Sequence, residues 1–357
     1  MENNIIDNNN NKNQKNINAN EIFIINKNIT GNFESISNLK NNYTENELRN
    51  LKKFQEYCIN NNINFENNNN LIISYDLIIR FLSSNKYNIK LTIQKLKQYI
   101  KFYKDFRVNE IPKELFNIDK IKIFYPHNVH KITLEGNPIL IQNLGEIQID
   151  DLNKILPDLI LKKYIIFFLE KIKNEIFPKT SKFYNKNINS IFCIVDLLGL
   201  TGSLLSKKVF NFLKIQLDIV ENYYPCIIEK LFFINTSFIF RATWNTCKYF
   251  FSKDIRNKIN LIGFNYFEQL NEKVAPVNLP KFFGGLCNCE PYGCIFSDEG
   301  PWNEKSLLNN LSNYKINENN IKKFNDNNTV NSNIKLKKVN DNILNLNKKL
   351  ELKQNEK

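Results

Sequence analysis

The sequence has few of the features that mark enzymes. Among 357 residues there are only two histidines, His127 and His130, and both belong to one predicted loop. The GxSxG nucleophile turn, the GxGxxG strand-turn and the phosphate-binding P-loop are all absent from the sequence. We therefore predict a protein that is not an enzyme, uses no cofactor and binds no metal.

Targeting and membrane-spanning segments are also missing. The chain does not open with a basic start followed by an apolar core of about 7 to 15 residues, as a secretion signal requires. The longest apolar runs, such as YIIFFL at 164–169, are far shorter than the roughly 20 residues that cross a bilayer. Seven cysteines, an odd number in a chain this long, favour free thiols in a reducing compartment. These observations predict a cytoplasmic protein.

The charge is unbalanced, with a formal net charge of +13. Such an excess attracts either nucleic acid or an anionic membrane. Because the sequence has no zinc-finger spacing and no aromatic RNA-binding signature, we do not expect nucleic acid as a partner. Asparagine and lysine dominate both ends, so we predict a disordered N-terminus over 1–40 and a disordered basic tail over 303–357.

The middle of the chain alternates strand-like and helix-like segments. Continuously apolar runs at 191–197, 230–235 and 259–264 are separated by helical patterns at 206–224 and 238–251. Runs without polar alternation are typical of strands covered on both faces, and intervening helices favour parallel pairing. A further strand is expected at 138–144, followed by one long helix at about 151–176.

Three helices are predicted upstream. Thr44 and Glu47 have the spacing of a capping box, Ser74 or Asp76 can cap a second helix, and Asn88 can cap a third. We therefore expect a helical N-terminal lobe at 44–110 and an α/β domain at 115–302.

Several segments together indicate a family. They occur in the order LIIRFLSSNKYNI (77–89), YPHNVHK (125–131), GNPILIQNLG (136–145), IVDLLGL (194–200), ENYYP (221–225), LPKFFGG (279–285) and SDEGPW (297–302). With these motifs the chain resembles the CRAL-TRIO lipid-binding family, in its branch of phosphatidylinositol/phosphatidylcholine transfer proteins, from about residue 48 to 302. The resemblance implies an α/β fold: a helical lobe, then a mixed, largely parallel sheet whose flanking helices enclose a lipid cavity closed by a movable gate helix.

The resemblance implies that the gate is the segment 237–251. Two long acyl chains carry roughly 20 to 25 kcal/mol of transfer free energy, at about 0.8 kcal/mol per buried CH₂, so a lipid must be enclosed while it crosses water. We expect hinges at the ends of this segment and at Gly284 and Gly285. The residues assigned to the gate and the acyl-chain cavity are Phe238, Ile239, Phe240, Trp244, Phe250 and Phe251.

The headgroup positions match the family only in part. Lys258 corresponds to a family lysine that contacts the inositol phosphate. The other inositol positions are occupied by Asn85, Cys226 and Ile255, and two choline positions by Ile191 and Cys193. The lipid therefore stays open: a phosphatidylinositol or phosphatidylcholine, another glycerophospholipid, a sterol or an isoprenoid.

Two further groups receive structural interpretations. Cys287, Cys289 and Cys294 have spacing that suggests zinc, but no clear fourth ligand accompanies them, and we interpret them as structural thiols. Asp196 is interpreted as a partner of a loop or helix cap.

Two functions remain open. One is a carrier that moves or presents one phospholipid between membranes. The other is a peripheral adaptor that senses lipid and recruits a partner such as a lipid kinase. In either case we expect a monomer that contacts anionic cytoplasmic membrane faces transiently.

Overall fold

The described part of this computed structural model comprises residues 43–63, 65, 73–200 and 206–303. Contacts divide the chain into two units, residues 1–79 and 80–357, which are described separately. The two predicted tails lie outside the described residues, apart from Asn303. Within the described residues, every helix is too short or too polar to cross a membrane.

The first unit contains α3 (Glu45–Asn60) and the start of α4 (Tyr75–Ser84). The predicted capping box is confirmed: the Glu47 amide donates to Thr44 Oγ1 at 3.3 Å, and the Thr44 amide donates to Glu47 Oε2 at 2.8 Å. Of the two candidate caps of α4, Ser74 accepts a hydrogen bond from the amide of Leu77 at 3.2 Å.

The second unit is built on a five-stranded sheet in the order β1-β2-β3-β4-β5. Strand β1 is antiparallel to β2, whereas all other neighbours are parallel. The predicted α/β class and largely parallel sheet are confirmed. Strand β1 was not predicted, since histidine, asparagine and lysine interrupt its apolar pattern. The strands are β1 (His127–Ile132), β2 (Pro138–Asn143), β3 (Ile191–Asp196), β4 (Ile228–Ile234) and β5 (Ile259–Leu261).

Helices precede, connect and follow these strands. The prediction of one helix at 151–176 is wrong, because the chain breaks at Leu156 and Pro157 between α7 and α8. Proline has no amide hydrogen to continue a helix and is tolerated only near a helix start. The helices are α5 (Ile89–Phe106), α6 (Ile118–Phe124), α7 (Ile149–Ile155), α8 (Asp158–Lys171), a π-helical turn (Ile172–Ile176), α9 (Phe177–Tyr184), α10 (Lys207–Tyr223), α11 (Phe238–Cys247), α12 (Lys253–Lys258) and α13 (Phe267–Asn271).

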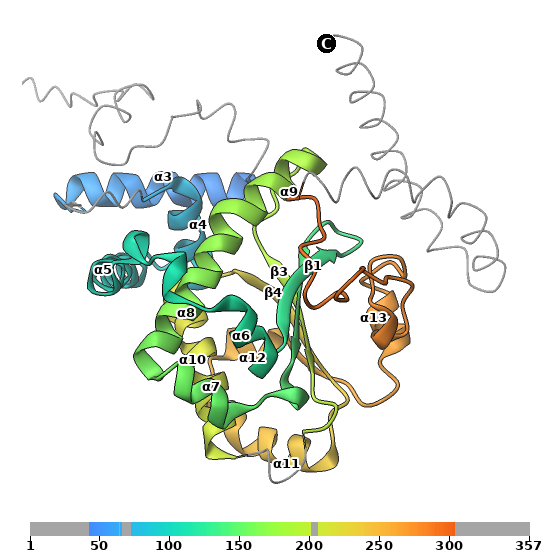
Figure 1. Cartoon of the computed structure of the whole chain (residues 1–357). Helices are drawn as coiled ribbons and strands as arrows, with labels where there is room; N and C mark the ends of the chain where they lie inside the picture. Colours follow the sequence, from blue (N-terminus) through green and yellow to red (C-terminus); the bar gives the residue numbers. More distant parts are fainter. Residues whose placement is uncertain (1–42, 64, 66–72, 201–205, 304–357) are drawn as a thin grey trace, which may run out of the picture. The chain divides into compact units, whose positions relative to one another are not determined.

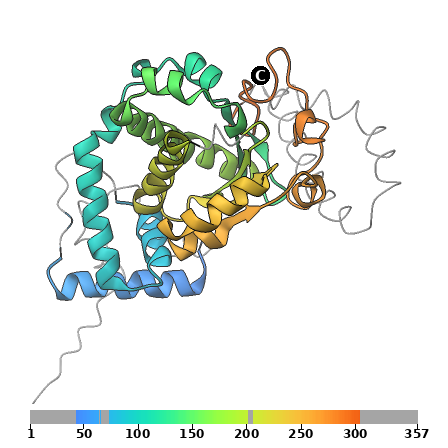
Figure 2. The ribbon, with the colours of Figure 1, turned by 90° about the horizontal axis from the view of Figure 1, so that it is seen from below.

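The two faces of the sheet bury different sets of side chains, since successive residues of a strand point to opposite faces. Phe192 and Ile194 of β3 belong to a closed core shared with α13 and the segment that follows it. Cys193 and Val195 point to the other face, where α8 and α10 lie. Figure 1 shows α13 on one side of the sheet and α8 and α10 on the other, and Figure 2 shows the same separation from below.

Hydrogen bonds connect the residues that directly follow β3 and β4. Asp196, at the end of β3, accepts hydrogen bonds from the Leu198 amide at 2.9 Å and from Asn235 Nδ2 at 2.7 Å. Asp196 therefore joins the loops after β3 and β4, as the sequence predicted. Helix α11 starts directly after the second loop, with Ser237 as its cap.

The pair Gly284 and Gly285 forms a tight turn. Gly284 has φ +85°, a value that favours glycine, and a Cβ on Gly285 would lie 1.9 Å from the carbonyl oxygen of Leu279. This close approach explains why both residues are glycine. Their role as a hinge stays a prediction.

Candidate functional site: an apolar cavity with polar groups

A cavity lies between the sheet and the helices that cover one of its faces. It holds about 830 Å³, including the part open to solvent, and nearly all of its lining is apolar. The apolar lining comprises Leu140, Leu152, Leu156, Leu161, Ile165, Phe168, Leu169, Ile191, Cys193, Val195, Phe212, Leu213, Leu217, Val220, Ile228, Leu231 and Phe233.

Five polar side chains also line this cavity: Tyr125, His127, Gln142, Tyr164 and Gln216. His127 Nδ1 lies 2.7 Å from the Tyr125 carbonyl oxygen, and its Nε2 lies 2.7 Å from the Tyr164 hydroxyl. Because a carbonyl oxygen only accepts, Nδ1 carries the proton and Nε2 accepts from Tyr164. Burial lowers the pKa of His127 to about 4, so the imidazole is neutral near pH 7.

Two of these polar groups are not satisfied within the protein. Gln142 Nε2 donates to Gln216 Oε1 at 3.2 Å. Among the described residues, however, the Tyr125 hydroxyl and Gln216 Nε2 are buried without a hydrogen-bond partner. Burial raises the pKa of Tyr125 and outweighs the nearby Gln216 side chain, which lowers it without reaching hydrogen-bond geometry, so the hydroxyl keeps its proton and remains a donor. An unpaired buried polar group costs about 1–3 kcal/mol, and a ligand with a polar group at this point would remove that cost.

None of these five residues was predicted from the sequence as a site residue, although two signals were present. Gln142 follows Leu140 by two residues, so the strand period places both on the same face. Gln216 interrupts the apolar stripe of α10 that includes Phe212 and Val220. Each is a polar residue at a core-facing position.

The predicted gate residues are divided between the core and the surface. Phe240 is buried against Phe233, with ring centroids 5.4 Å apart, and Trp244 lies 6.1 Å from the same ring. Phe238 is 86% exposed and Ile239 is 55% exposed. Among the described lining residues of the cavity, none comes from α11. Phe240 and Trp244 of α11 instead pack on Phe233, which is a lining residue from β4. Phe251 stacks on Trp244 at 5.6 Å, and the side chain of Phe250 lies outside the described structure.

Lys258 lies at the end of α12, beside the beginning of β4. Its Nζ donates to the Ile228 carbonyl oxygen at 2.6 Å, and the Ile228 side chain lines the cavity. The lysine is therefore next to the cavity but is partly held by the backbone.

The substituted headgroup positions are not gathered at one site. Ile191 and Cys193 line the cavity, and burial raises the pKa of the Cys193 thiol. Asn85 Nδ2 instead donates to the Phe81 carbonyl oxygen at 2.7 Å, and Cys226 Sγ donates to that of Arg80 at 3.8 Å. Ile255 is buried in α12.

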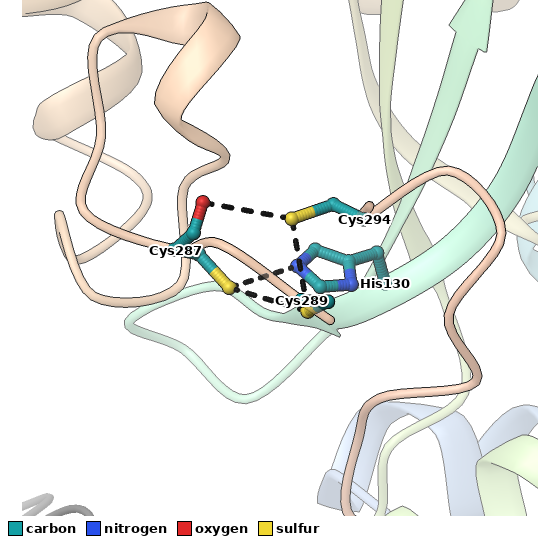
Figure 3. A group of neighbouring side chains, drawn as sticks. All are labelled: His130, Cys287, Cys289 and Cys294. Carbon is teal, nitrogen blue, oxygen red and sulfur yellow. Dashed lines mark hydrogen bonds between the residues drawn. The ribbon is translucent and has the colours of Figure 1, made fainter. Parts of the chain in front are cut away.

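The three clustered cysteines lie elsewhere, beside strand β1. Cys287 Sγ is 3.5 Å from His130 Nε2 and 3.6 Å from Cys289 Sγ. Figure 3 shows His130 projecting from the strand toward all three cysteines. The fourth candidate ligand that the sequence analysis did not identify is therefore present.

Comparison with known proteins agrees with this fold. Residues 124–285 match the family model described as the CRAL/TRIO domain. This part of the chain is therefore similar to the CRAL/TRIO domain, in agreement with the resemblance that the sequence motifs indicated.

Three curated relatives illustrate the similarity. "Phosphatidylinositol/phosphatidylcholine transfer protein SFH11" of Arabidopsis thaliana is 33% identical over 65% of this chain and 63% of its own length. "Phosphatidylinositol/phosphatidylcholine transfer protein SFH7" of the same plant is 32% identical over 65% of this chain and 43% of its own length. "Sec14 cytosolic factor" of Schizosaccharomyces pombe is 29% identical over 65% of this chain and 81% of its own length. The chain thus spans less than two thirds of the two plant relatives. Among solved structures, "Crystal structure of Sfh5" aligns with a TM-score of 0.45 and 14% identity over 64% of this chain and 84% of that chain.

The buried His127 predicts a pH-dependent contribution to stability. Its pKa is about 4 in the folded protein, against 6.5 for a free histidine. Between these values the unfolded chain binds one more proton, so the free energy of unfolding falls as pH decreases from 6.5 to 4. We expect that urea unfolding of the His127→Gln variant will lack this part of the pH dependence, a slope of about 1.4 kcal/mol per pH unit. A stability difference from wild type that stays constant over this range would contradict the assignment.

Proposed function

We propose that this protein binds one phospholipid in the cavity and carries it between membranes without bond chemistry. The observation that carries the proposal is the cavity itself, an apolar space with two unpaired polar groups in its wall. Relatives named phosphatidylinositol/phosphatidylcholine transfer proteins support the choice of ligand. The polar groups would bind the polar part of the lipid, while the apolar lining would bury its chains.

The exposed apolar residues at the carboxyl end of the sheet support contact with a membrane. Leu198, Phe238 and Phe264 follow β3, β4 and β5 and are 60%, 86% and 68% exposed. Because the carboxyl ends of parallel strands meet at one edge of the sheet, these side chains share that edge. We define Leu198, Phe238, Ile239 and Phe264 as the apolar edge. Single exposed apolar residues are ordinary, but a cluster marks an interaction surface.

Basic groups flank an exposed aromatic ring in the segment that follows α11. Tyr249, 71% exposed, has Lys248 Nζ at 5.4 Å and the Arg256 guanidinium at 5.3 Å from its ring centroid. Cations beside exposed aromatic rings suit the boundary of an anionic bilayer. We infer that the apolar edge docks on a membrane and that docking moves α11 away from Phe233, which opens the cavity.

The cellular setting follows from the same proposal. A relative named a cytosolic factor supports action in the cytosol with peripheral contact to cytoplasmic membrane faces. We propose a monomer, because a carrier needs no second subunit. A lipid kinase as partner stays a prediction of the family resemblance.

The first prediction from this proposal concerns the apolar edge. A double variant, Phe238→Asp and Ile239→Asp, should lower phospholipid transfer between two vesicle populations at least about tenfold, because charged side chains oppose insertion. Both residues are exposed, so the unfolding temperature should not change. The matched control is Ile123→Asp with Leu159→Asp, which alters residues that are 57% and 58% exposed on α6 and α8. Equal transfer by the two double variants would exclude the apolar edge as the docking surface.

The second prediction separates a ligand-binding role of Tyr125 from a structural one. In ligand-free protein, Tyr125→Phe removes an unpaired buried hydroxyl and should raise the free energy of unfolding by about 1 kcal/mol. The same variant should load phospholipid less well. The control, Tyr164→Phe, removes a hydroxyl that donates to His127 and should lower stability. A loss of stability in Tyr125→Phe, with unchanged loading, would argue against the polar anchor.

The third prediction concerns Lys258 and headgroup charge. Lys258→Ala should reduce loading of phosphatidylinositol more than loading of phosphatidylcholine, because only the former carries a net negative charge for an ammonium group to bind. Loading from mixed vesicles can be measured by native mass spectrometry after re-isolation of the protein. Lys253→Ala, on the exposed start of the same helix, is the control. Equal losses for both lipids would show that Lys258 does not read the headgroup.

A further inference from the structure

A cluster of one imidazole and three thiols lies outside the lipid cavity, on edge strand β1. His130 comes from β1, whereas Cys287, Cys289 and Cys294 come from the segment after the Gly284–Gly285 turn. His130, Cys287 and Cys294 are buried, and Cys289 is partly exposed. The four candidate ligand atoms all lie within 4.8 Å of one another.

The spacing of these atoms resembles that of a tetrahedral zinc site. With bonds of about 2.3 Å to sulfur and about 2.0 Å to nitrogen, a tetrahedron puts two sulfurs about 3.8 Å apart and a sulfur about 3.5 Å from the nitrogen. The sulfur of Cys289 lies 3.6 Å from that of Cys287 and 3.7 Å from that of Cys294. Cys287 Sγ lies 3.5 Å from His130 Nε2. A disulfide, at about 2.05 Å, is excluded at these distances.

The orientation of His130 also suits a metal ligand. Ser297 Oγ donates to the Cys294 carbonyl oxygen at 3.0 Å and lies 3.2 Å from His130 Nδ1. Since the single hydroxyl hydrogen is used, Ser297 accepts from Nδ1, and the lone pair is left on Nε2, which faces the thiols. Metal-binding histidines are commonly held in this way through their second nitrogen.

An irregularity in the backbone of β1 places the positively charged side chain of Lys131 beside the cluster of thiols. The register of β1 shifts between Val129 and Ile132, and Lys131 has φ +49°. Such a bulge re-aims side chains that would otherwise alternate between faces. The Lys131 ammonium group lies beside the Cys287 sulfur and donates to the Val277 carbonyl oxygen at 3.3 Å. One zinc ion with three thiolates has a net charge of about −1, which this ammonium would balance.

We propose that His130, Cys287, Cys289 and Cys294 bind one zinc ion as a structural site. Three sulfurs and one nitrogen around a tetrahedral centre are a ligand set typical of structural zinc sites. Four protein ligands leave no open position, which distinguishes a structural site from a catalytic one. The three cysteines give up their protons when the metal binds, and the imidazole binds in its neutral form.

The site would hold the segment 287–303 against the outer edge of strand β1. Lys131 N donates to the Glu299 carbonyl oxygen at 2.7 Å, and the Asn128 side-chain amide donates to that of Ser297. On the other side of the cluster, the Cys287 amide donates to the Leu279 carbonyl oxygen at 3.0 Å. Zinc would therefore join β1, the glycine turn and the final described segment, and it would cover an edge that could otherwise pair with another chain.

The experiment uses the full chain, purified under reducing conditions without added chelator. We expect about one equivalent of zinc by elemental analysis. After chelation, titration with Co²⁺ should produce the thiolate-to-cobalt charge-transfer absorption and the visible bands of tetrahedral cobalt. Chelation should also lower the unfolding temperature, and addition of zinc should restore it.

Variants then test the ligand set. Cys289→Ser, at the most exposed ligand, should lose most of the zinc and weaken the cobalt charge-transfer band. The control Cys58→Ser, a free cysteine on α3, should keep both. Ser297→Ala should weaken cobalt binding by about tenfold or more, because it frees the imidazole without removing a ligand.

The outcomes that overturn the proposal are independent of variant folding. Wild-type protein that contains no zinc and gives no thiolate-to-cobalt band on titration would exclude the site. A disulfide among these cysteines in freshly reduced and re-isolated protein would also exclude the site. A visible spectrum that depends on iron would show that the bound metal is iron and would overturn the assignment of zinc.

Discussion

The structure depends on a parallel sheet whose two faces must both be covered. In β3 all six residues are buried, so neither face can remain in water without exposing a continuous apolar surface. One face is closed by α13 and the segment that follows it, with Phe192 and Ile194 in a packed core. The other face is covered by α8 and α10, but these helices leave a cavity against Cys193 and Val195. A single six-residue strand therefore supplies both the rigid core and the wall of the site.

A cavity with unpaired polar groups in its wall is costly to maintain. Well-packed interiors have few voids larger than a water molecule, and the unpaired hydroxyl of Tyr125 and amide of Gln216 add to the cost. Such a combination is expected where stability is sacrificed for binding. It favours a ligand with a long apolar part and one polar group over a purely hydrocarbon ligand.

Much of the fold could be predicted from the sequence because its signals are local. The caps at Thr44 and Asn88 and the continuous apolar run of β3 each depend on neighbours within a few residues. The cavity could be placed only through the family resemblance, since Tyr125, Gln142 and Gln216 are brought together by the packing of distant elements. The thiol cluster shows the same limit. His130 and Cys287 are 157 positions apart, and the strand that carries His130 was itself not apparent in the sequence.

The contacts at the β1 edge of the sheet differ from those at the carboxyl ends of its strands, and this difference bears on where the cavity would open. On the β1 border, the segment 287–303 is bonded to Asn128 and Lys131 and carries the proposed zinc ligands. At the carboxyl end, α11 is attached mainly through Phe240 on Phe233 and through Arg241, whose Nε donates to Thr236 Oγ1 at 2.9 Å. Moving α11 exposes few side chains beyond Phe240 and Trp244, and a bilayer can accept both. Moving the β1 border would break several backbone hydrogen bonds and expose an unpaired strand edge. Under the proposal that docking opens the cavity, the many hydrogen bonds at the β1 edge therefore favour α11 as the element that moves, next to the side chains that would meet the membrane.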